Sequence, residues 1–245
     1  MRDMAVGGQG APLAPYLHYL LFRDARRSRA VVNIGGISNL TYLPAAGSLQ
    51  SVLAFDTGPG NMLIDGLVRH FTKGRELFDR NGRLATKGTV HPALLARLCR
   101  HQFLKRRPPK STGREDFGER FLNEVLHLGY TTTLDLKDII ATATAYTART
   151  IADAQRFLPG RIDEVLICGG GGRNTALLRM LQTAWDGPMV RRVESVGWNG
   201  RALEAAAFAV FAYQAVRGVS CNLPSVTGAT REVVLGSITP AHLRR

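Results

Sequence analysis

The clearest pattern of apolar and polar residues lies in the first third of the chain, where an apolar run, a turn and an amphipathic segment follow one another. Val52 to Phe55 is a continuous apolar run, typical of a strand buried on both faces. From Leu63 to Phe71 apolar residues recur at helical spacing, and Asn61 is a suitable N-cap. Because Thr57-Gly58-Pro59-Gly60 favours a turn, we expect the strand to end at Asp56.

Asp56 is the first candidate functional residue. In α/β proteins ligands bind beyond the carboxyl ends of strands, where glycines and helix N-termini favour phosphate groups. An acid at such a junction is placed to act as a general base. The alternative is that Asp56 only hydrogen-bonds its own turn, as aspartates often do.

A second junction of the same kind follows residue 165. Val165 to Cys168 reads as a buried strand, Gly169 to Gly172 as a loop, and Asn174 as the cap of a helix. Four glycines leave bare backbone against which a flat ring could lie. A third glycine loop, Gly197 to Gly200, follows the strand around Met189 to Val193 and opens a helix. Three such junctions, with an acid at one of them, favour a nucleotide ligand.

The remaining pattern predicts further helices and strands along the chain. They are an apolar helix around Pro15 to Phe22, a hairpin over Val31 to Leu43 that turns at Gly35-Gly36, a helix from Pro92 that stops before Arg106, a long helix from Asp135 to Leu158 with Asp135 as its cap, a strand around Met189 to Val193, and a helix capped by Asn199 that carries Glu204. Phe78 to Lys87 reads as a polar loop, and the tail from Asn222 as turn-rich and then briefly β-like. Lys110 to Phe117 fits either an anion-binding set or a capped helix start, and spacing favours the helix start.

Composition indicates an ordinary globular protein. The chain has 245 residues, of which 45% are hydrophobic, and no apolar run approaches the roughly 18 residues that span a bilayer. The first residues lack the layout of a signal peptide, so we expect a cytoplasmic protein without a membrane partner. Cys99, Cys168 and Cys221 are far apart and follow no metal-binding spacing, which indicates reduced thiols.

The net charge of +13 is compatible with an anionic ligand and raises the question of nucleic acid. The basic residues are scattered, however, and aromatic residues make up only 7% of the chain. No helix-turn-helix or RNA-binding pattern accompanies them. Solvated faces are therefore the better explanation, and no nucleic-acid partner is expected.

A dinucleotide-binding fold is the main alternative for the second junction. Gly169-x-Gly171 follows a strand, and Glu194 comes about twenty residues after the loop, which partly matches that fingerprint. The third glycine position is Asn174, which suits a helix cap better than close packing of helix and strand. We therefore rank this alternative second.

Seven motifs, in this order, resemble those of anhydro-N-acetylmuramic acid kinases over nearly the whole chain: NIGGISNLTYLP, AFDTGPGNMLIDG, FDRNGRLATKG, HPALLARL, PPKSTGREDF, LICGGGGRN and NLPSVTGA. The resemblance implies the superfamily of sugar kinases, heat-shock chaperones and actin, whose two α/β lobes close over ATP. The expected fold class is thus α/β: an actin/hexokinase-like (ribonuclease H-like) lobe with a mixed sheet and flanking helices. The implied reaction uses ATP and Mg²⁺. Water opens the 1,6-anhydro ring of the sugar while O6 is phosphorylated, giving N-acetylmuramic acid 6-phosphate in cell-wall recycling.

The resemblance also implies roles for particular residues. Asp56 would be the base that activates water, Glu204 would lie near the sugar, and the loop with Gly8 and Gln9 would lie near the cleft. The nucleotide would meet Gly35, Gly36, Gly58, Gly169, Gly170, Gly171, Gly172 and Asn174. The first two of these would face the phosphates and the last five would adjoin the adenosine. No residue is assigned to a metal, and the family tends to form homodimers.

One departure from the family pattern concerns the start of the chain. Family members begin with a strand and a phosphate loop like SGTSxDGxD, which is absent here. We therefore expect residues 1–30 to be a remnant of a largely missing first lobe and residues 31–245 to form the second lobe with the nucleotide and sugar site. The chain by itself is then expected to be inactive or nearly so, and a non-catalytic nucleotide-binding remnant is a third alternative.

Overall fold

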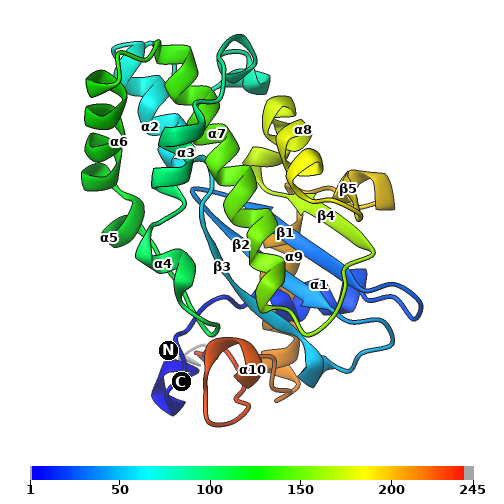
Figure 1. The fold of residues 1–245 in the computed structure, drawn as a ribbon. Coiled ribbons are helices and arrows are strands. Elements are labelled where there is room, and N and C mark those ends of the chain that lie inside the picture. The colour runs from blue at the N-terminus through cyan, green and yellow to red at the C-terminus, as the bar shows by residue number, and fades with distance from the viewer. Residues whose placement is uncertain (1, 240–245) are drawn as a thin grey trace.

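The computed structural model describes residues 2–239, which build a five-stranded mixed sheet covered by helices (Figure 1). The strands are β1 (Arg29–Ile34), β2 (Ile37–Leu43), β3 (Leu53–Pro59), β4 (Glu164–Cys168) and β5 (Met189–Arg192). Their order in the sheet is β3-β2-β1-β4-β5, and β2 alone runs against its neighbours. This is the mixed arrangement of a ribonuclease H-like lobe, so the predicted α/β fold class is confirmed.

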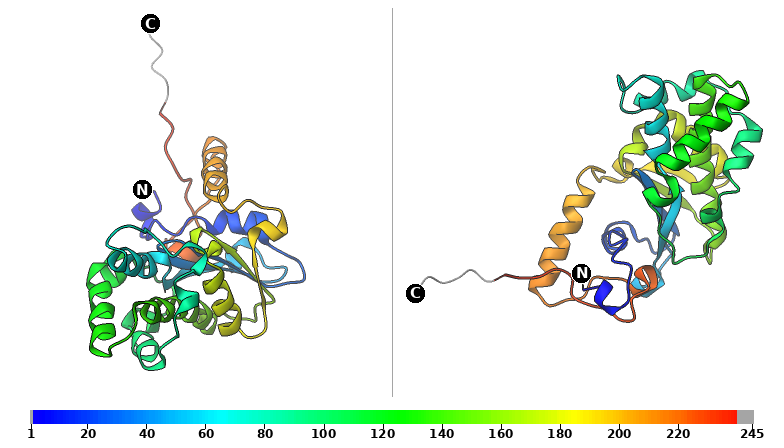
Figure 2. Two further views of the ribbon diagram at one scale, coloured as in Figure 1. Left: turned by 90° about the horizontal axis from the view of Figure 1, so that it is seen from above. Right: turned by 90° about the vertical axis from the view of Figure 1, so that its left-hand side faces the viewer.

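Ten α-helices accompany the sheet in the described residues. They are α1 (Pro15–Phe22), α2 (Asn61–Phe71), α3 (Pro92–Leu98), α4 (Gln102–Lys105), α5 (Arg114–Phe117), α6 (Glu119–Thr131), α7 (Leu136–Asp153), α8 (Thr175–Ala184), α9 (Leu203–Val216) and α10 (Pro224–Thr227). Helices α7 and α8 cover one face of the sheet, and α1 and α9 lie on the other. The right-hand view of Figure 2 shows α9 standing apart from the helices around α7.

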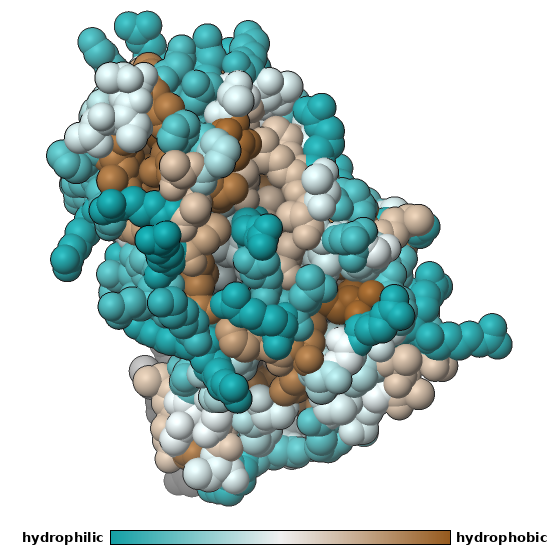
Figure 3. Space-filling view, viewed as in Figure 1, coloured by the Kyte–Doolittle hydropathy of each residue, from teal (hydrophilic) through white to brown (hydrophobic). Residues whose placement is uncertain are grey.

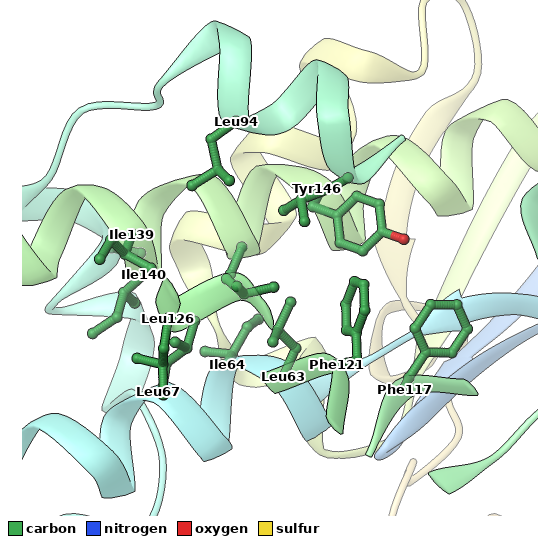
Figure 4. Close-up of a cluster of buried hydrophobic side chains, with 14 of the residues drawn as sticks. Leu63, Ile64, Leu67, Leu94, Phe117, Phe121, Leu126, Ile139, Ile140 and Tyr146 are labelled. Carbon is green, nitrogen blue, oxygen red and sulfur yellow. The ribbon is translucent and has the colours of Figure 1, made fainter. Parts of the chain in front are cut away.

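Apolar side chains gather in three clusters. One lies under α7 and α8, and a second lies between the sheet and α1, α9 and the C-terminal segment. The third lies beyond the sheet among α2, α3, α6 and α7, where leucine, isoleucine and aromatic side chains point toward one another (Figure 4). The small residues of α7 allow it to serve two of these clusters at once, because alanine and threonine permit close approach on several sides.

The predicted hairpin is confirmed, and its turn is held by the start of α2. β1 and β2 pair in antiparallel fashion on either side of Gly35 and Gly36. The Gly60 amide donates to the Gly36 carbonyl (2.8 Å) and the Asn61 amide to the Gly35 carbonyl (2.7 Å). The glycine turn and the first residues of α2 therefore form one fixed unit at the carboxyl end of β1.

β3 corrects the expectation that the strand ends at Asp56. The strand runs on to Pro59, where Ile37 pairs with Pro59 and Ser38 with Gly58. Proline is tolerated because β3 is an edge strand and the missing amide would face away from β2. Gly58 supplies a φ of 140°, which other residues rarely adopt. Asp56 consequently lies within the strand.

Two predicted helix caps are confirmed and two are wrong. Asp135 accepts a hydrogen bond from the Lys137 amide and Asn174 accepts one from the Leu177 amide, as expected of N-caps. Asn61 is instead the first residue of α2, after Gly60, and its side chain donates to the Ile34 carbonyl (3.2 Å). Asn199 accepts from the Arg201 amide in a turn ahead of α9, whose N-cap position is Ala202.

Other boundaries also differ from expectation. α7 ends at Asp153 and continues to Phe157 only as a tighter 3₁₀ turn, because Pro159-Gly160 prevents a longer helix. The helix from Pro92 ends at Leu98, and a separate short helix precedes Arg106. The tail forms α10 at Pro224 to Thr227, and residues 228–239 contain no strand, so the β-like expectation there is wrong.

Asp3 joins the first residues of the described chain to the last. Its carboxylate is 1% exposed and accepts from the Asn222 amide group (2.7 Å), the Thr227 hydroxyl (2.8 Å) and the Gly10 backbone amide (2.9 Å). The Gln9 amide donates to the Thr227 carbonyl (2.9 Å). Three donors from two ends of the sequence thus converge on one buried acid.

The surface is mixed in character. Figure 3 shows apolar patches between hydrophilic side chains on the face seen in Figure 1. α9 exposes several large apolar side chains, namely Phe208, Tyr213 and Val216. Only Leu203 and Ala207 of this helix are buried. Within residues 2–239, no helix combines the length and the apolar character needed to cross a membrane. Cys99, Cys168 and Cys221 are free thiols.

Candidate functional site

A row of polar side chains crosses the sheet at the carboxyl end of β1. Cys168 pairs with Asn33, Asn33 with Asn39, and Asn39 with Asp56. Directly paired residues present their side chains on the same face, and neighbouring strands lie about 4.8 Å apart. Asp56 is therefore on the same face as Asn33, two strands away.

A β-bulge interrupts the pairing beside Asp56. Ser38 pairs with Gly58 and Asn39 with Asp56, so Thr57 has no partner of its own in the ladder. The Ser38 and Thr57 hydroxyls hydrogen-bond each other at 2.5 Å, and Ser38 is fully buried. Bulges of this kind occur next to active sites, where they re-aim a side chain. Sequence reasoning from turn propensity does not reveal this bulge.

The Asp56 carboxyl is partly buried and weakly bonded. Burial raises its pKa to about 6, and the Thr112 amide, which donates to Oδ2 at 2.8 Å, opposes that rise. In the part of the chain that the structure describes, Thr112 is the one hydrogen-bond donor to this carboxylate. An acid whose pKa lies near neutrality is suited to accept a proton, because it is ionised at pH 7 and still basic enough to hold the proton.

A cavity of about 570 Å³ lies on the face that the polar row shares. Its lining includes Asn33 and Cys168 from the row, Gly169 and Gly170 from the loop after β4, and Glu204 from α9. The structure thus brings the glycine loop and Glu204 together, although they are far apart in sequence. Asp56 does not line this cavity, but it belongs to the row that forms its floor at Asn33 and Cys168.

A second cavity, of about 470 Å³, lies on the other side of the same glycine loop. It is lined by Asn61 and Asp65 of α2, by residues 78–81, and by Asn174. Gly170 and Arg173 line both cavities. One short loop therefore separates two spaces, each large enough for part of a small-molecule ligand.

Three glycines of this loop differ in what an added side chain would contact. A Cβ at Gly171 would overlap the buried side chain of Ile34, and one at Gly169, whose φ is 81°, would overlap Asn33. At Gly170 the nearest atom to a Cβ is Asn61 Nδ2 at 3.8 Å, an ordinary contact. Gly169 and Gly171 are thus required by the fold itself, and Gly170 is the position whose bare backbone faces open space.

The other predicted residues fall in three places. Gly35 and Gly36 form the hairpin turn against α2, and Gly58 packs against Thr150 and Leu104 near the bulge. Gly8 and Gln9 fold around Asp3 and α10, and they line neither of the two cavities. Their predicted place near the sugar therefore stays a prediction.

Further residues at the cavities escaped sequence reasoning. His18 of α1 lines the Glu204 cavity, and burial lowers its pKa to about 4, so its ring is neutral at pH 7. Its Nδ1 lies 2.9 Å from the Thr41 hydroxyl. In the second cavity, partial burial raises the pKa of Asp65 to about 6, and Asp79 adds to that rise while Arg69 opposes it. Neither His18 nor Asp65 lies in a sequence motif or spacing that would identify it as a site residue.

The described residues contain no group of three or more His, Cys, Asp and Glu side chains that could hold a metal ion. A magnesium ion in phosphoryl-transfer enzymes is usually carried by the substrate phosphates with one or two carboxylates. Such a metal needs no more than one or two carboxylates from the protein.

Comparison with known proteins places the chain in a family. A family model described as anhydro-N-acetylmuramic acid kinase matches residues 1–241. The protein of that name from Gloeobacter violaceus is 47% identical over 245 residues, which is 98% of this chain and 62% of the relative. The one from Caldanaerobacter subterraneus subsp. tengcongensis is 42% identical over 242 residues, which is 98% of this chain and 61% of the relative. The chain thus spans about three-fifths of the length of these curated relatives.

Among solved structures, component A of (R)-2-hydroxyglutaryl-CoA dehydratase from Acidaminococcus fermentans is similar to this chain. The match covers 80% of this chain and 65% of that protein's chain. Its TM-score is 0.48 and its sequence identity 18%. The assignment of this chain to a family rests on the family model and the sequence relatives, and not on this solved structure. The chain belongs to the anhydro-N-acetylmuramic acid kinase family.

Proposed function

We propose that this chain is the part of an anhydro-N-acetylmuramic acid kinase that holds ATP at the Gly169–Asn174 loop and the sugar beside Glu204. The observation that carries the proposal is the polar row from Cys168 to Asp56, which extends from the floor of the Glu204 cavity to a half-buried acid. The cavity between Asn61 and Asn174 is the better place for the adenosine, because Asn174 and the open Gly170 both line it.

In the proposed reaction, Asp56 accepts a proton from water. The water oxygen forms a bond to C1 of the sugar, and the bond between C1 and O6 breaks. O6 takes the γ-phosphoryl group of ATP, and ADP leaves with the electron pair of the broken phosphorus–oxygen bond. The products are N-acetylmuramic acid 6-phosphate and ADP. The pKa of Asp56, near 6, supports this role because the base must be ionised at neutral pH.

The other residues position the reactants. Glu204, in the first turn of α9, is exposed in the cavity and can accept hydrogen bonds from sugar hydroxyls. We propose that Mg²⁺ enters with the nucleotide phosphates and offsets their charge. Arg173, which lines both cavities, offers a cation to an anionic ligand.

The test is Asp56→Asn in a protein completed by the preceding portion of a family relative, assayed with ATP, Mg²⁺ and anhydro-N-acetylmuramic acid. Turnover should fall by about 10²–10⁴-fold, the usual effect of removing a general base, with unchanged ATP affinity by calorimetry. Asp186→Asn, which removes one charge from an exposed loop, is the matched control and should keep full turnover. Turnover within about threefold of wild type in Asp56→Asn would refute the proposed base.

ATP and NAD titrations separate the kinase from the dinucleotide alternative. The kinase proposal predicts a measurable affinity for ATP and none for NAD. Preferential binding of NAD would favour the alternative, in which Glu194, at the edge of the 570 Å³ cavity, would meet a ribose.

A further inference from the structure

A segment outside the sheet completes the free edge of β3 at Asp56. The Asp56 backbone amide donates to the Lys110 carbonyl (3.1 Å), and the Thr112 amide donates to Asp56 Oδ2 (2.8 Å). Because β3 is the outermost strand, these two hydrogen bonds supply the partner that the sheet does not. Residues 110–112 therefore hold both the backbone and the carboxylate of Asp56.

The Lys110 side chain is buried beneath this segment. It is 6% exposed, and its ammonium nitrogen lies 4.5 Å from the ring centre of Phe103, 4.7 Å from that of Phe157 and 5.7 Å from that of Phe55. These distances are those of cation–π contacts. The ammonium also donates to the Phe103 carbonyl at 3.5 Å. Three rings from β3, α4 and the turn after α7 thus form an aromatic cage around one cation.

Burying the Lys110 ammonium costs free energy of folding, which an interaction with an opposite charge can offset. Burial lowers the pKa of Lys110 to about 8, and Arg156 and Arg106 repel its charge, while Asp56 is the opposite charge that favours it. Reciprocally, Lys110 favours the ionised form of Asp56 and Glu115 opposes it. An apolar side chain of similar length would fill the aromatic cage without this cost.

The other end of the segment is fixed as well. The Thr112 hydroxyl donates to Asp116 of α5 at 2.7 Å, and Arg106 pairs with the same carboxylate at 3.6 Å. The backbone that contacts Asp56 is therefore held at Lys110 by the aromatic cage and at Thr112 by α5. Movement of either end would move the donor that holds the Asp56 carboxylate.

We propose that Lys110 is the positioning residue of Asp56: its caged ammonium fixes residues 110–112 against the edge of β3, and thereby sets the direction and the charge of the Asp56 carboxylate. The inference rests on the proposed role of Asp56 as the base. Lys110 acts through Thr112 and through its charge, without contact with the substrate. This assigns a role to the PPKSTGREDF motif beyond the start of a short helix.

The first test follows the Asp56 carboxyl by ¹³C NMR titration in the 245-residue chain. Lys110→Met keeps the length of the side chain and removes its charge, so the titration midpoint of Asp56 should rise by about 0.5–1 pH unit, less than the 1–3 units caused by a charge in direct contact. Lys110→Arg retains a cation and should leave the midpoint within about 0.3 unit. Lys105→Met removes an exposed lysine of α4 and is the matched control. Equal midpoints in Lys110→Met and Lys105→Met would overturn the inference.

A measurement on the unmodified chain keeps the inference testable if Lys110→Met fails to fold. The Thr112 amide proton donates to Asp56, so its chemical shift should follow the same midpoint as the Asp56 carboxyl. The amide should also exchange slowly with solvent. A Thr112 amide that is insensitive to pH where Asp56 titrates would contradict the proposed contact.

Kinetics on the completed two-lobe protein show whether the positioning matters for the reaction. In Lys110→Met the acidic limb of kcat/KM should move to higher pH together with the NMR midpoint, while KM for ATP stays unchanged. A shift in KM for ATP with no change in the pH profile would indicate a merely structural role and overturn the inference. Failure of the proposed function gives a different result, since Asp56→Asn would then keep its turnover whatever Lys110 does.

Discussion

The burial of Asp56 affects stability as well as chemistry. Its pKa is raised from 3.8 to about 6, so the protonated form is favoured by folding. The stability that this gives is fully present below the unfolded pKa and is lost as pH rises through the folded pKa. At neutral pH the Asp56 carboxylate is ionised in both states, but in the folded protein it is partly buried and its charge is penalised.

Asp56→Asn should accordingly stabilise the protein in a pH-dependent way. We expect the variant to gain about 1–2 kcal/mol more in free energy of unfolding, relative to wild type, at about pH 8 than at about pH 4.5, because only the ionised acid is penalised. Urea unfolding at the two pH values measures this difference. An equal gain at both pH values would mean that the carboxylate is not the source of the penalty.

The glycine loop allows a sharper contrast between two neighbouring residues. Gly170→Val adds a side chain where the nearest atom to its Cβ is 3.8 Å away, so it should weaken ATP binding by about tenfold or more without loss of stability. Gly171→Ala should instead cost about 1–3 kcal/mol in unfolding free energy, because its methyl group overlaps buried Ile34. Calorimetry with ATP and urea unfolding separate the two effects. Unchanged ATP affinity in folded Gly170→Val would move the nucleotide away from this loop.

The role of a single residue could be predicted from the sequence where it depends on neighbouring residues in the chain. It was missed where it depends on contacts between distant segments. Asp135 and Asn174 were identified as caps because a cap depends on its own backbone. Asn33 and Asn39 were missed because a two-residue turn at Gly35-Gly36 would pair Asn33 with Ser38, whereas the observed register is centred on Gly36 and pairs Asn33 with Asn39. Lys110 could not be placed, since its cage is built from three separate segments.

Among the elements, α8 links stability and binding through its cap. Asn174 Oδ1 accepts from the Leu177 amide (3.0 Å) and Asn174 also lines the proposed adenosine cavity. Asn174→Ala should cost about 1 kcal/mol of stability and also weaken ATP binding, whereas Asn174→Asp keeps the cap and the stability. Asp135→Ala removes the cap of α7 far from the loop and controls for stability alone. Equal ATP affinity in Asn174→Ala and Asp135→Ala would exclude Asn174 from the nucleotide site.

The type of most elements could be predicted from periodicity, but the residues at which they end could not. The hairpin, the buried β4 strand and the long α7 helix each have a strong repeat that fixes their type. The end of β3 was misplaced because Thr57-Gly58-Pro59 is a turn sequence that an edge strand tolerates. The expected strand in the tail did not form, because a β-propensity run needs a neighbouring strand to pair with.

At the scale of the whole molecule, the chain spans about three-fifths of the length of its relatives. Phosphoryl transfer depends on positioning and on charge stabilisation around the γ-phosphate, and closure of two lobes excludes water. We expect the 245-residue chain to bind ATP but to turn over at most about a hundredth as fast as the same chain joined to the preceding portion of a relative. A coupled ADP-release assay compares the two. Comparable turnover would show that the chain contains the complete phosphate site.

The buried carboxylate of Asp3 makes the C-terminal part of the described chain depend on a residue near its other end. Asp3→Ala would remove the acceptor shared by Gly10, Asn222 and Thr227. Each buried donor left without a partner costs about 1–3 kcal/mol. A substitution at residue 3 would therefore loosen the chain 219 residues further on in the sequence.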